Sequence, residues 1–158
     1  MFIKTVLLAV IAVVMQGCVT INPDHLLPMG TKVEIQDVSN EAGFDSGFLK
    51  NFDMNMIRKK LVLFIGEELT QRAIETVPAD AGAAAAKLKL NILSLSSKKG
   101  KYEIAYKVTL EAVDGSLLFT DSDEKEDDDI EGIIHKIATR VARYTDRSFK
   151  KPITETSQ

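Results

Sequence analysis

The side chain with the most distinctive chemistry in this sequence is its single cysteine, Cys18. A cysteine sulfur can act as a nucleophile, bind a metal or accept a covalent group. With no second cysteine in the chain, Cys18 cannot form an intramolecular disulfide. It follows an apolar run, residues 5–15, which comes after the positive charge of Lys4. A run of this length is typical of the core of an export signal, and it is shorter than the roughly 20 apolar residues that cross a bilayer. We therefore expect Cys18 to mark the end of an export signal.

The residues around the cysteine make this expectation more specific. Gln16-Gly17-Cys18 closes the apolar run, and a hydrophobic stretch followed by a small residue and a cysteine resembles the signal of bacterial lipoproteins. Met15 and Gln16 depart from the commonest form of that signal. The resemblance implies cleavage after residue 17 and lipidation of Cys18 with long acyl chains such as palmitate. Because Val19 rather than Asp follows, the sorting rule of enteric lipoproteins implies the outer membrane, facing the periplasm. An ordinary secretory signal or a buried N-terminal helix is the alternative.

The acidic segment 121–129 (DSDEKEDDD) is the one compositional anomaly in the rest of the chain. Dense carboxylates supply the hard oxygen ligands that Ca²⁺ prefers. The spacing does not match an EF-hand loop, because Lys125 takes the fifth position and Glu126 takes the glycine position. A solvated loop that leads into the N-terminus of a helix explains the same residues, since acids are favourable there. We therefore expect a solvated loop and assign no metal site.

Other candidate residues lack the neighbours that catalysis needs. His25 and His135 are isolated in the sequence and are interpreted as a linker residue and a surface residue. Ser94, Ser96 and Ser97 lack the Gly-x-Ser-x-Gly elbow of a serine nucleophile. No phosphate-binding glycine loop or zinc-spaced cluster is present in the sequence. We therefore predict a protein that is not an enzyme, with no catalytic residue, no cofactor and no metal ligand assigned.

Composition and charge narrow the class of protein further. The chain has 158 residues, of which 45% are hydrophobic and 27% charged, which suits one folded domain. Its formal net charge of −3 excludes the non-specific nucleic-acid binding that arrays of Lys and Arg provide. Lys98, Lys99 and Lys101 could contact anionic lipid or glycan at a hairpin tip, but we interpret them as solvated.

The hydrophobic pattern predicts four strands and two helices behind the signal. Apolar and polar residues alternate in 32–38, in 88–92 and most regularly in 102–112, and Asp114-Gly115 predicts a hairpin to a returning strand at 116–120. Helical spacing covers 53–74 and 128–147. The expected divisions are a signal peptide at 1–17, a lipidated cysteine and tether at 18–30, a periplasmic domain at 31–149 and a disordered tail at 150–158. The expected fold is a two-layer α+β domain, in which two helices cover a four-stranded, mostly antiparallel sheet (β-α-β-β-β-α).

This order of elements behind a lipidated cysteine is similar to that of several small envelope lipoproteins. The residues that carry the resemblance are AAAAKLKLNILSLSS and VTLEAVDGSLLFTDS, which resemble the Ala-rich strand entry and the hairpin of LptE-like, TolB N-terminal and CsgG-like domains. The resemblance implies the fold and the envelope compartment. The lipid anchor, together with a compact domain that lacks a catalytic constellation, favours a non-catalytic accessory or assembly factor that is held at the outer membrane and binds another envelope protein. A periplasmic module that binds a lipid, glycan or other small amphiphile is the alternative. The exposed sheet face with Glu103, Lys107, Thr109 and Glu111 is a candidate docking surface.

Overall fold

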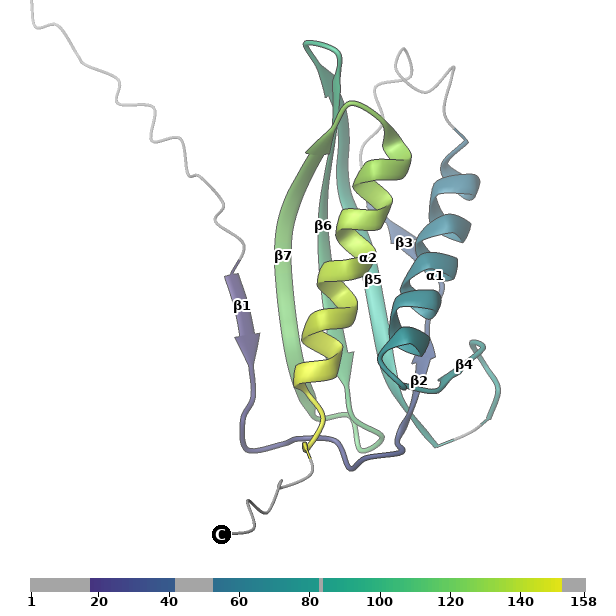
Figure 1. Cartoon of the computed structure of the whole chain (residues 1–158), viewed down its shortest axis with the longest axis vertical. Coiled ribbons are helices and arrows are strands. Elements are labelled where there is room, and N and C mark those ends of the chain that lie inside the picture. Colours follow the sequence, from purple (N-terminus) through teal and green to yellow (C-terminus); the bar gives the residue numbers. More distant parts are fainter. Residues whose placement is uncertain (1–17, 42–52, 83, 152–158) are drawn as a thin grey trace, which may run out of the picture.

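The computed structural model describes residues 18–41, 53–82 and 84–151, which form one mixed β-sheet of seven strands with two helices packed on the same face (Figure 1). The elements in chain order are β1 (Cys18–Ile21), β2 (Lys32–Ile35), β3 (Ser39–Asn40), α1 (Met54–Gln71), β4 (Thr76–Val77), β5 (Ala85–Lys98), β6 (Lys101–Glu111), β7 (Leu117–Asp127) and α2 (Ile130–Arg147). The strand order is β1-β7-β6-β5-β2-β4, and β3 also pairs with β5.

The long strands β5, β6 and β7 form the antiparallel meander that the alternating pattern predicts. The β5–β6 turn places Lys99 and Gly100 at φ 53° and 78°, and the β6–β7 turn places Gly115 at φ 84°. A tight hairpin needs these left-handed conformations, and glycine adopts them without steric cost. In β5 the register shifts between Ile92 and Ser94, which accounts for the change of phase in the apolar pattern of this strand.

The other half of the sheet is parallel. β2 pairs in parallel with both β5 and β4, and β3 pairs in parallel with β5. Parallel neighbours need a crossover connection, which α1 provides between β2 and β5. The expectation of four mostly antiparallel strands is therefore wrong, although the chain is an α+β protein. The missed strands β1, β3 and β4 have two to four residues each, too few to show a period in the sequence.

Both predicted helices are present and contribute 11 of the 27 described residues of the hydrophobic core. The Asp53 and Asp129 side chains accept hydrogen bonds from backbone N–H groups of the first turns of α1 and α2, so each serves as an N-cap. Helical spacing brings the apolar residues of each helix onto the face that meets the sheet. The buried residues of the helices are Ile57, Leu61, Ile65 and Leu69 in α1 and Ile130, Ile133, Ile134, Ile137, Ala138, Val141, Ala142 and Thr145 in α2.

The segment 18–30, which we expected to act as a tether, is partly built into the domain. β1 pairs with β7 along the edge of the sheet, with Cys18 opposite Ser122. Leu27 is buried and its backbone bridges to Phe149, beyond the end of α2. Burial of the apolar Leu27 side chain in the core is more favourable in free energy than its exposure in a solvated tether. The lipidation candidate Cys18 is therefore part of β1. The predicted signal, 1–17, and most of the predicted tail lie outside the described residues.

Candidate functional site

Residues 121–127 of the acidic segment belong to a strand and not to the solvated loop that we expected. β7 extends to Asp127, and alternation along it places Phe119, Asp121, Asp123 and Lys125 opposite the inward-facing residues of β6. Asp121 is fully buried. A carboxylate can be buried in a core when it is paired with a cation. The cation that pairs with Asp121 lies 19 residues further along the chain, on the next element, α2, so the acidic segment alone does not show it.

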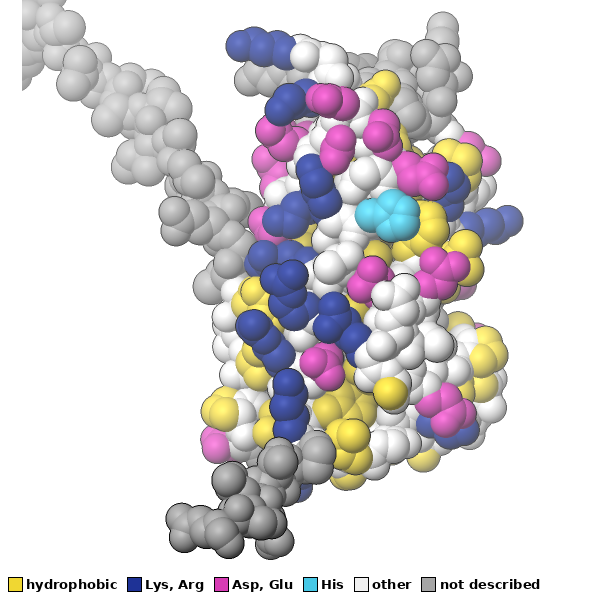
Figure 2. All heavy atoms as spheres, viewed as in Figure 1, with side chains coloured by type: hydrophobic (Ala, Val, Ile, Leu, Met, Phe, Trp, Pro, Cys, Tyr) yellow, Lys and Arg dark blue, Asp and Glu magenta, His cyan; other side chains and the backbone are white. Residues whose placement is uncertain are grey.

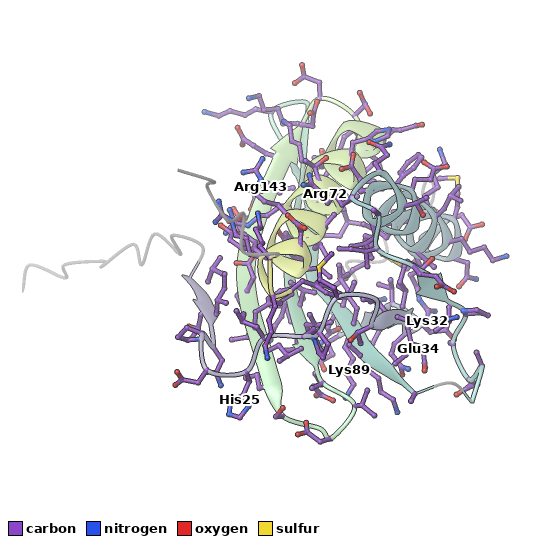
Figure 3. The ribbon with its side chains drawn as sticks, turned by 60° about the horizontal axis from the view of Figure 1, so that its bottom comes forward. His25, Lys32, Glu34, Arg72, Lys89 and Arg143 are labelled. Atoms are coloured by element: carbon purple, nitrogen blue, oxygen red, sulfur yellow. The ribbon has the colours of Figure 1, made fainter. Side chains whose placement is uncertain are left out.

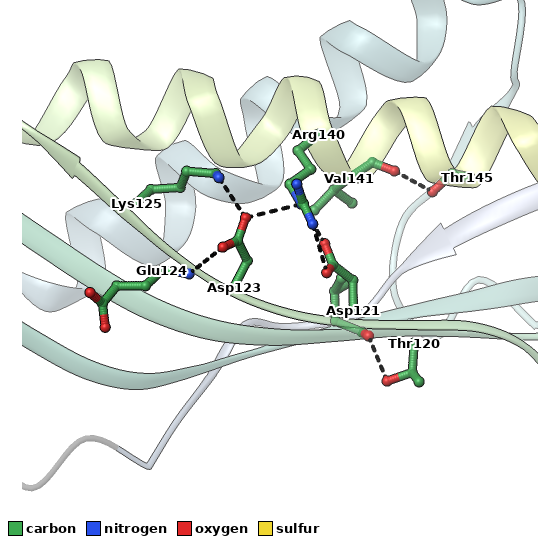
Figure 4. A network of polar contacts seen from close by, with 9 residues as sticks. Thr120, Asp121, Asp123, Glu124, Lys125, Arg140, Val141 and Thr145 are labelled. Atoms are coloured by element: carbon green, nitrogen blue, oxygen red, sulfur yellow. Dashed lines mark hydrogen bonds and ion pairs between the residues drawn. The ribbon is translucent and has the colours of Figure 1, made fainter. Parts of the chain in front are cut away.

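That cation is Arg140 of α2, which forms a bidentate ion pair with Asp121 (Figure 4). Arg140 Nε donates to Asp121 Oδ2 at 2.7 Å, and the guanidinium Nη2 donates to Oδ1 at 3.1 Å. Arg140 Nε also lies 3.2 Å from Asp123 Oδ2, and Lys125 Nζ lies 2.5 Å from the same oxygen. Two acids of β7 and two cations thus form one network between the sheet and α2.

The local environment favours the charged forms of Asp123 and Arg140. Burial opposes ionisation of Asp123, but the hydrogen bond from Lys125, the backbone N–H of Glu124 and the nearby cations outweigh it and lower the pKa of Asp123. The hydrogen bonds to Asp121 raise the pKa of Arg140. Burial raises the pKa of the neighbouring Tyr106 hydroxyl, which has no hydrogen-bond partner within the described residues. The network therefore acts as a polar clamp that fixes α2 on β7.

The structure does not gather the other sequence candidates into a site. His25 is exposed in the loop after β1, and His135 stacks on Phe64 of α1 with ring centroids 4.1 Å apart. Ser94, Ser96 and Ser97 lie along β5. No group of three or more His, Cys, Asp or Glu side chains placed to hold a metal ion is found within residues 18–41, 53–82 and 84–151.

The sheet face opposite the helices is open and carries alternating charges. Lys89 pairs with Glu111 at 2.7 Å, and Lys101 pairs with Glu126 at 3.1 Å. Figure 3 shows Lys89 on the side of the sheet away from the helices. Glu124 of β7 shares a hydrogen bond with Glu103 of β6, and this contact, with burial and carboxylate repulsion, raises the pKa of Glu124. This face corresponds to the polar surface that the sequence suggested for docking.

A groove that sequence reasoning missed lies between α1 and the β2–β4 edge of the sheet. Its volume is about 800 Å³. Gly66 forms part of its floor, because a Cβ built there would lie 3.7 Å from Ile35 Cδ1. Leu63 at the rim is 56% exposed. The one feature of the sequence that could have indicated this groove is Gly66, a small residue inside an apolar helix. The lining residues are Ile35, Asp37, Val62, Leu63, Gly66, Glu67, Thr70, Gln71, Thr76, Val77, Pro78 and Ala79.

Among the described residues, neither helix is long and apolar enough to cross a membrane.

Comparisons with known proteins identify similar folds. No protein-family model and no curated protein matches the sequence. PelC from Paraburkholderia phytofirmans, a dodecamer in two crystal forms, matches with TM-scores of 0.62 and 0.61 at 13% and 14% identity, over 82% and 81% of this chain and 97% and 96% of PelC. The hypothetical protein CT253 from Chlamydia trachomatis matches with a TM-score of 0.50 at 10% identity, over 73% of this chain and 98% of its own.

A lipoprotein is also among the similar structures. GNA1162 from Neisseria meningitidis matches with a TM-score of 0.49 at 12% identity, over 72% of this chain and 96% of its own. At these identities the matches to PelC and CT253 show a shared fold. They extend over nearly the full length of PelC and of CT253, at 97% and 98%.

Proposed function

We propose that this chain is a lipid-anchored, non-catalytic envelope protein that acts as an assembly factor through protein contacts. The observation that carries the proposal is the place of Cys18, which follows the apolar run in the sequence and begins β1 in the structure. Lipid on this residue would hold the folded domain directly at a membrane surface. Two or three acyl chains give firm attachment, since each buried methylene contributes about 0.8 kcal/mol. The outer membrane, facing the periplasm, remains the proposed location.

The proposed mode of action is contact with another protein along the open sheet face and the short edge strands. β1 covers β7 only opposite residues 119–122, so residues 123–127 of β7 have no strand on their outer side within the described residues. Such an edge can accept a strand of a partner. The dodecameric state of PelC, which shares this fold, supports a first partner that is another copy of this chain. A different envelope protein remains the alternative partner.

Three measurements test this proposal. Cells that express the chain are labelled with radioactive palmitate, and the Cys18→Ser variant is the control. We expect label in the wild-type protein and none in the variant, together with fractionation of the wild type to the outer membrane. Label that persists in Cys18→Ser would refute lipidation at this residue. In-cell crosslinking then tests assembly: absence of any specific crosslinked envelope partner or self-oligomer would refute the assembly role.

The groove favours a second candidate function, binding of a small amphiphile. Its lining includes the apolar residues Ile35, Val62 and Val77 and the acidic residues Asp37 and Glu67. A cavity of about 800 Å³ falls in the range of about 300–1,000 Å³ that small-molecule sites occupy. Native mass spectrometry of the purified protein would show a co-purifying lipid-sized mass. The mass should be lost from Leu63→Glu and retained in Val113→Glu, which replaces another exposed apolar residue, outside the groove.

A further inference from the structure

A band of cations runs along the exposed side of α2 and the adjoining part of β7. We call it the basic band, and Figure 2 shows it as a row of dark blue side chains down the length of the domain. Along α2 the members are three or four positions apart, so they lie on one stripe of the helix. The basic band consists of Lys125, Lys136, Arg140, Arg143, Arg147 and Lys150.

Half of the basic band is not neutralised by the protein itself. Lys125 and Arg140 are paired with Asp121 and Asp123, and Lys136 is paired with Asp127. The remaining three cations, Arg143, Arg147 and Lys150, are exposed.

Within residues 18–41, 53–82 and 84–151 these three cations have no ion-pair partner, and Arg147 makes only a cation–π contact with Tyr144. The chain as a whole is acidic, with a net charge of −3. A positive band on an acidic protein points to an anionic partner on this side of the molecule.

The basic band also lies beside the lipidation candidate. The register pairs Asp121 directly with Val19, the residue after Cys18, and Asp121 is the carboxylate that holds Arg140. Neighbouring strands are about 4.8 Å apart. Cys18 on β1 is therefore one strand spacing from β7, and Arg140 of the basic band is held on β7 by its ion pair with Asp121. Because β1 is hydrogen-bonded to β7, no linker separates Cys18 from the folded domain in the described part of the chain.

Figure 3 shows Arg143 on the side of α2 away from α1, which is also the side of β7 and β1. The surface is hollowed at the upper part of the basic band, where a cavity of about 460 Å³ has room for a phosphate headgroup. Its lining residues are Lys125, His135, Lys136, Thr139, Arg140 and Arg143.

We infer that the basic band is the surface by which the anchored domain lies on an anionic lipid membrane. This inference rests on the proposed lipidation, because lipid on Cys18 would bring this side of the domain to the headgroups. Contact with anionic headgroups favours Lys and Arg within a Debye length of the surface. The basic band would then fix the orientation of the domain and leave the groove, which lies at the opposite β2–β4 edge of the sheet, directed away from the bilayer.

The test separates the basic band from the lipid anchor. The chain from residue 18 to 158 with Cys18→Ser retains every described helix and strand and cannot be lipidated. Its binding is measured by co-sedimentation with mixed phosphatidylglycerol–phosphatidylcholine vesicles and with pure phosphatidylcholine vesicles at low salt. We expect binding only to the anionic vesicles, and a loss of about tenfold or more for Arg143→Glu/Arg147→Glu, since each cation near the surface adds to the attraction.

The matched control is Lys59→Glu/Lys107→Glu. It makes the same change of net charge at two exposed cations, on α1 and on the open sheet face. Thermal unfolding confirms that both variants fold. Binding that is equally weak in both pairs, or no binding of the wild type to anionic vesicles, would overturn the inference. A change in self-association of Arg143→Glu/Arg147→Glu without a change in vesicle binding would instead identify a protein interface and also overturn it. Failure of palmitate labelling would remove the proposed function and leave these vesicle measurements unaffected.

Discussion

Removal of the arginine from the polar clamp should destabilise the domain severely. In Arg140→Leu the Asp121 carboxylate stays fully buried but loses both hydrogen bonds from the guanidinium. A buried charge left without its partner costs about 3–5 kcal/mol. For a domain of this size each kcal/mol lowers the melting temperature by about 2–4 °C, so we expect a decrease of about 6–20 °C. The measurement is thermal and urea unfolding of the chain from residue 18.

Two further variants distinguish this mechanism from a simple loss of packing. The double variant Asp121→Leu/Arg140→Leu removes both charges, and replacement of a buried pair by apolar residues is often neutral or stabilising. Its stability should therefore recover most of the loss. Arg143→Leu is the control, because this neighbouring cation is exposed and forms no ion pair in the described part of the chain; it should change stability by no more than about 0.5 kcal/mol.

The dependence on pH supplies an independent check. In the wild type, the lowered pKa of Asp123 means that its contribution is complete above its unfolded pKa and is lost as the pH falls through the lower, folded value. The explanation is refuted if Arg140→Leu loses less than about 1 kcal/mol, or if the double variant is as unstable as the single one.

Three other substitutions test separate parts of the structure. Glu124→Gln should stabilise the domain by a few tenths of a kcal/mol at pH 7, because it removes repulsion with Glu103 at an exposed site. Since the pKa of Glu124 is raised, the repulsion exists only above the folded pKa, so the gain should vanish near pH 4; a gain that persists there would contradict this cause. Gly66→Ala should raise stability by up to about 1 kcal/mol in urea unfolding, because the helix interior gains a methyl group at ordinary contact distance from Ile35. Asp129→Ala should lower the free energy of unfolding by about 1 kcal/mol through loss of the N-cap of α2, and Asp129→Ser should retain most of it.

The elements with many residues in regular alternation were predictable. The pattern in 102–112 and the turn at Asp114-Gly115 give β6 and the hairpin to β7, and helical spacing gives α1 and α2. Each of these depends on contacts between residues near in sequence, so local periodicity records them. The end of β7 was missed because its inward positions are occupied by Asp121 and Asp123. Aspartates predict solvent exposure in the sequence, and the fold pairs these two with Arg140.

The sequence by itself determined the α+β class, the two helices, the meander and the prominence of Cys18. Only the tertiary structure decided the parallel half of the sheet, the pairing of β1 with β7 and the groove beside Gly66. These features join segments that are far apart in the chain, and the strands involved are too short to leave a period. The cations of the basic band are regularly spaced along one helix, which the sequence shows. Only the pairing of β1 with β7 shows that Cys18 lies beside them. Long-range pairing is fixed by the total burial of the fold, which no single segment records.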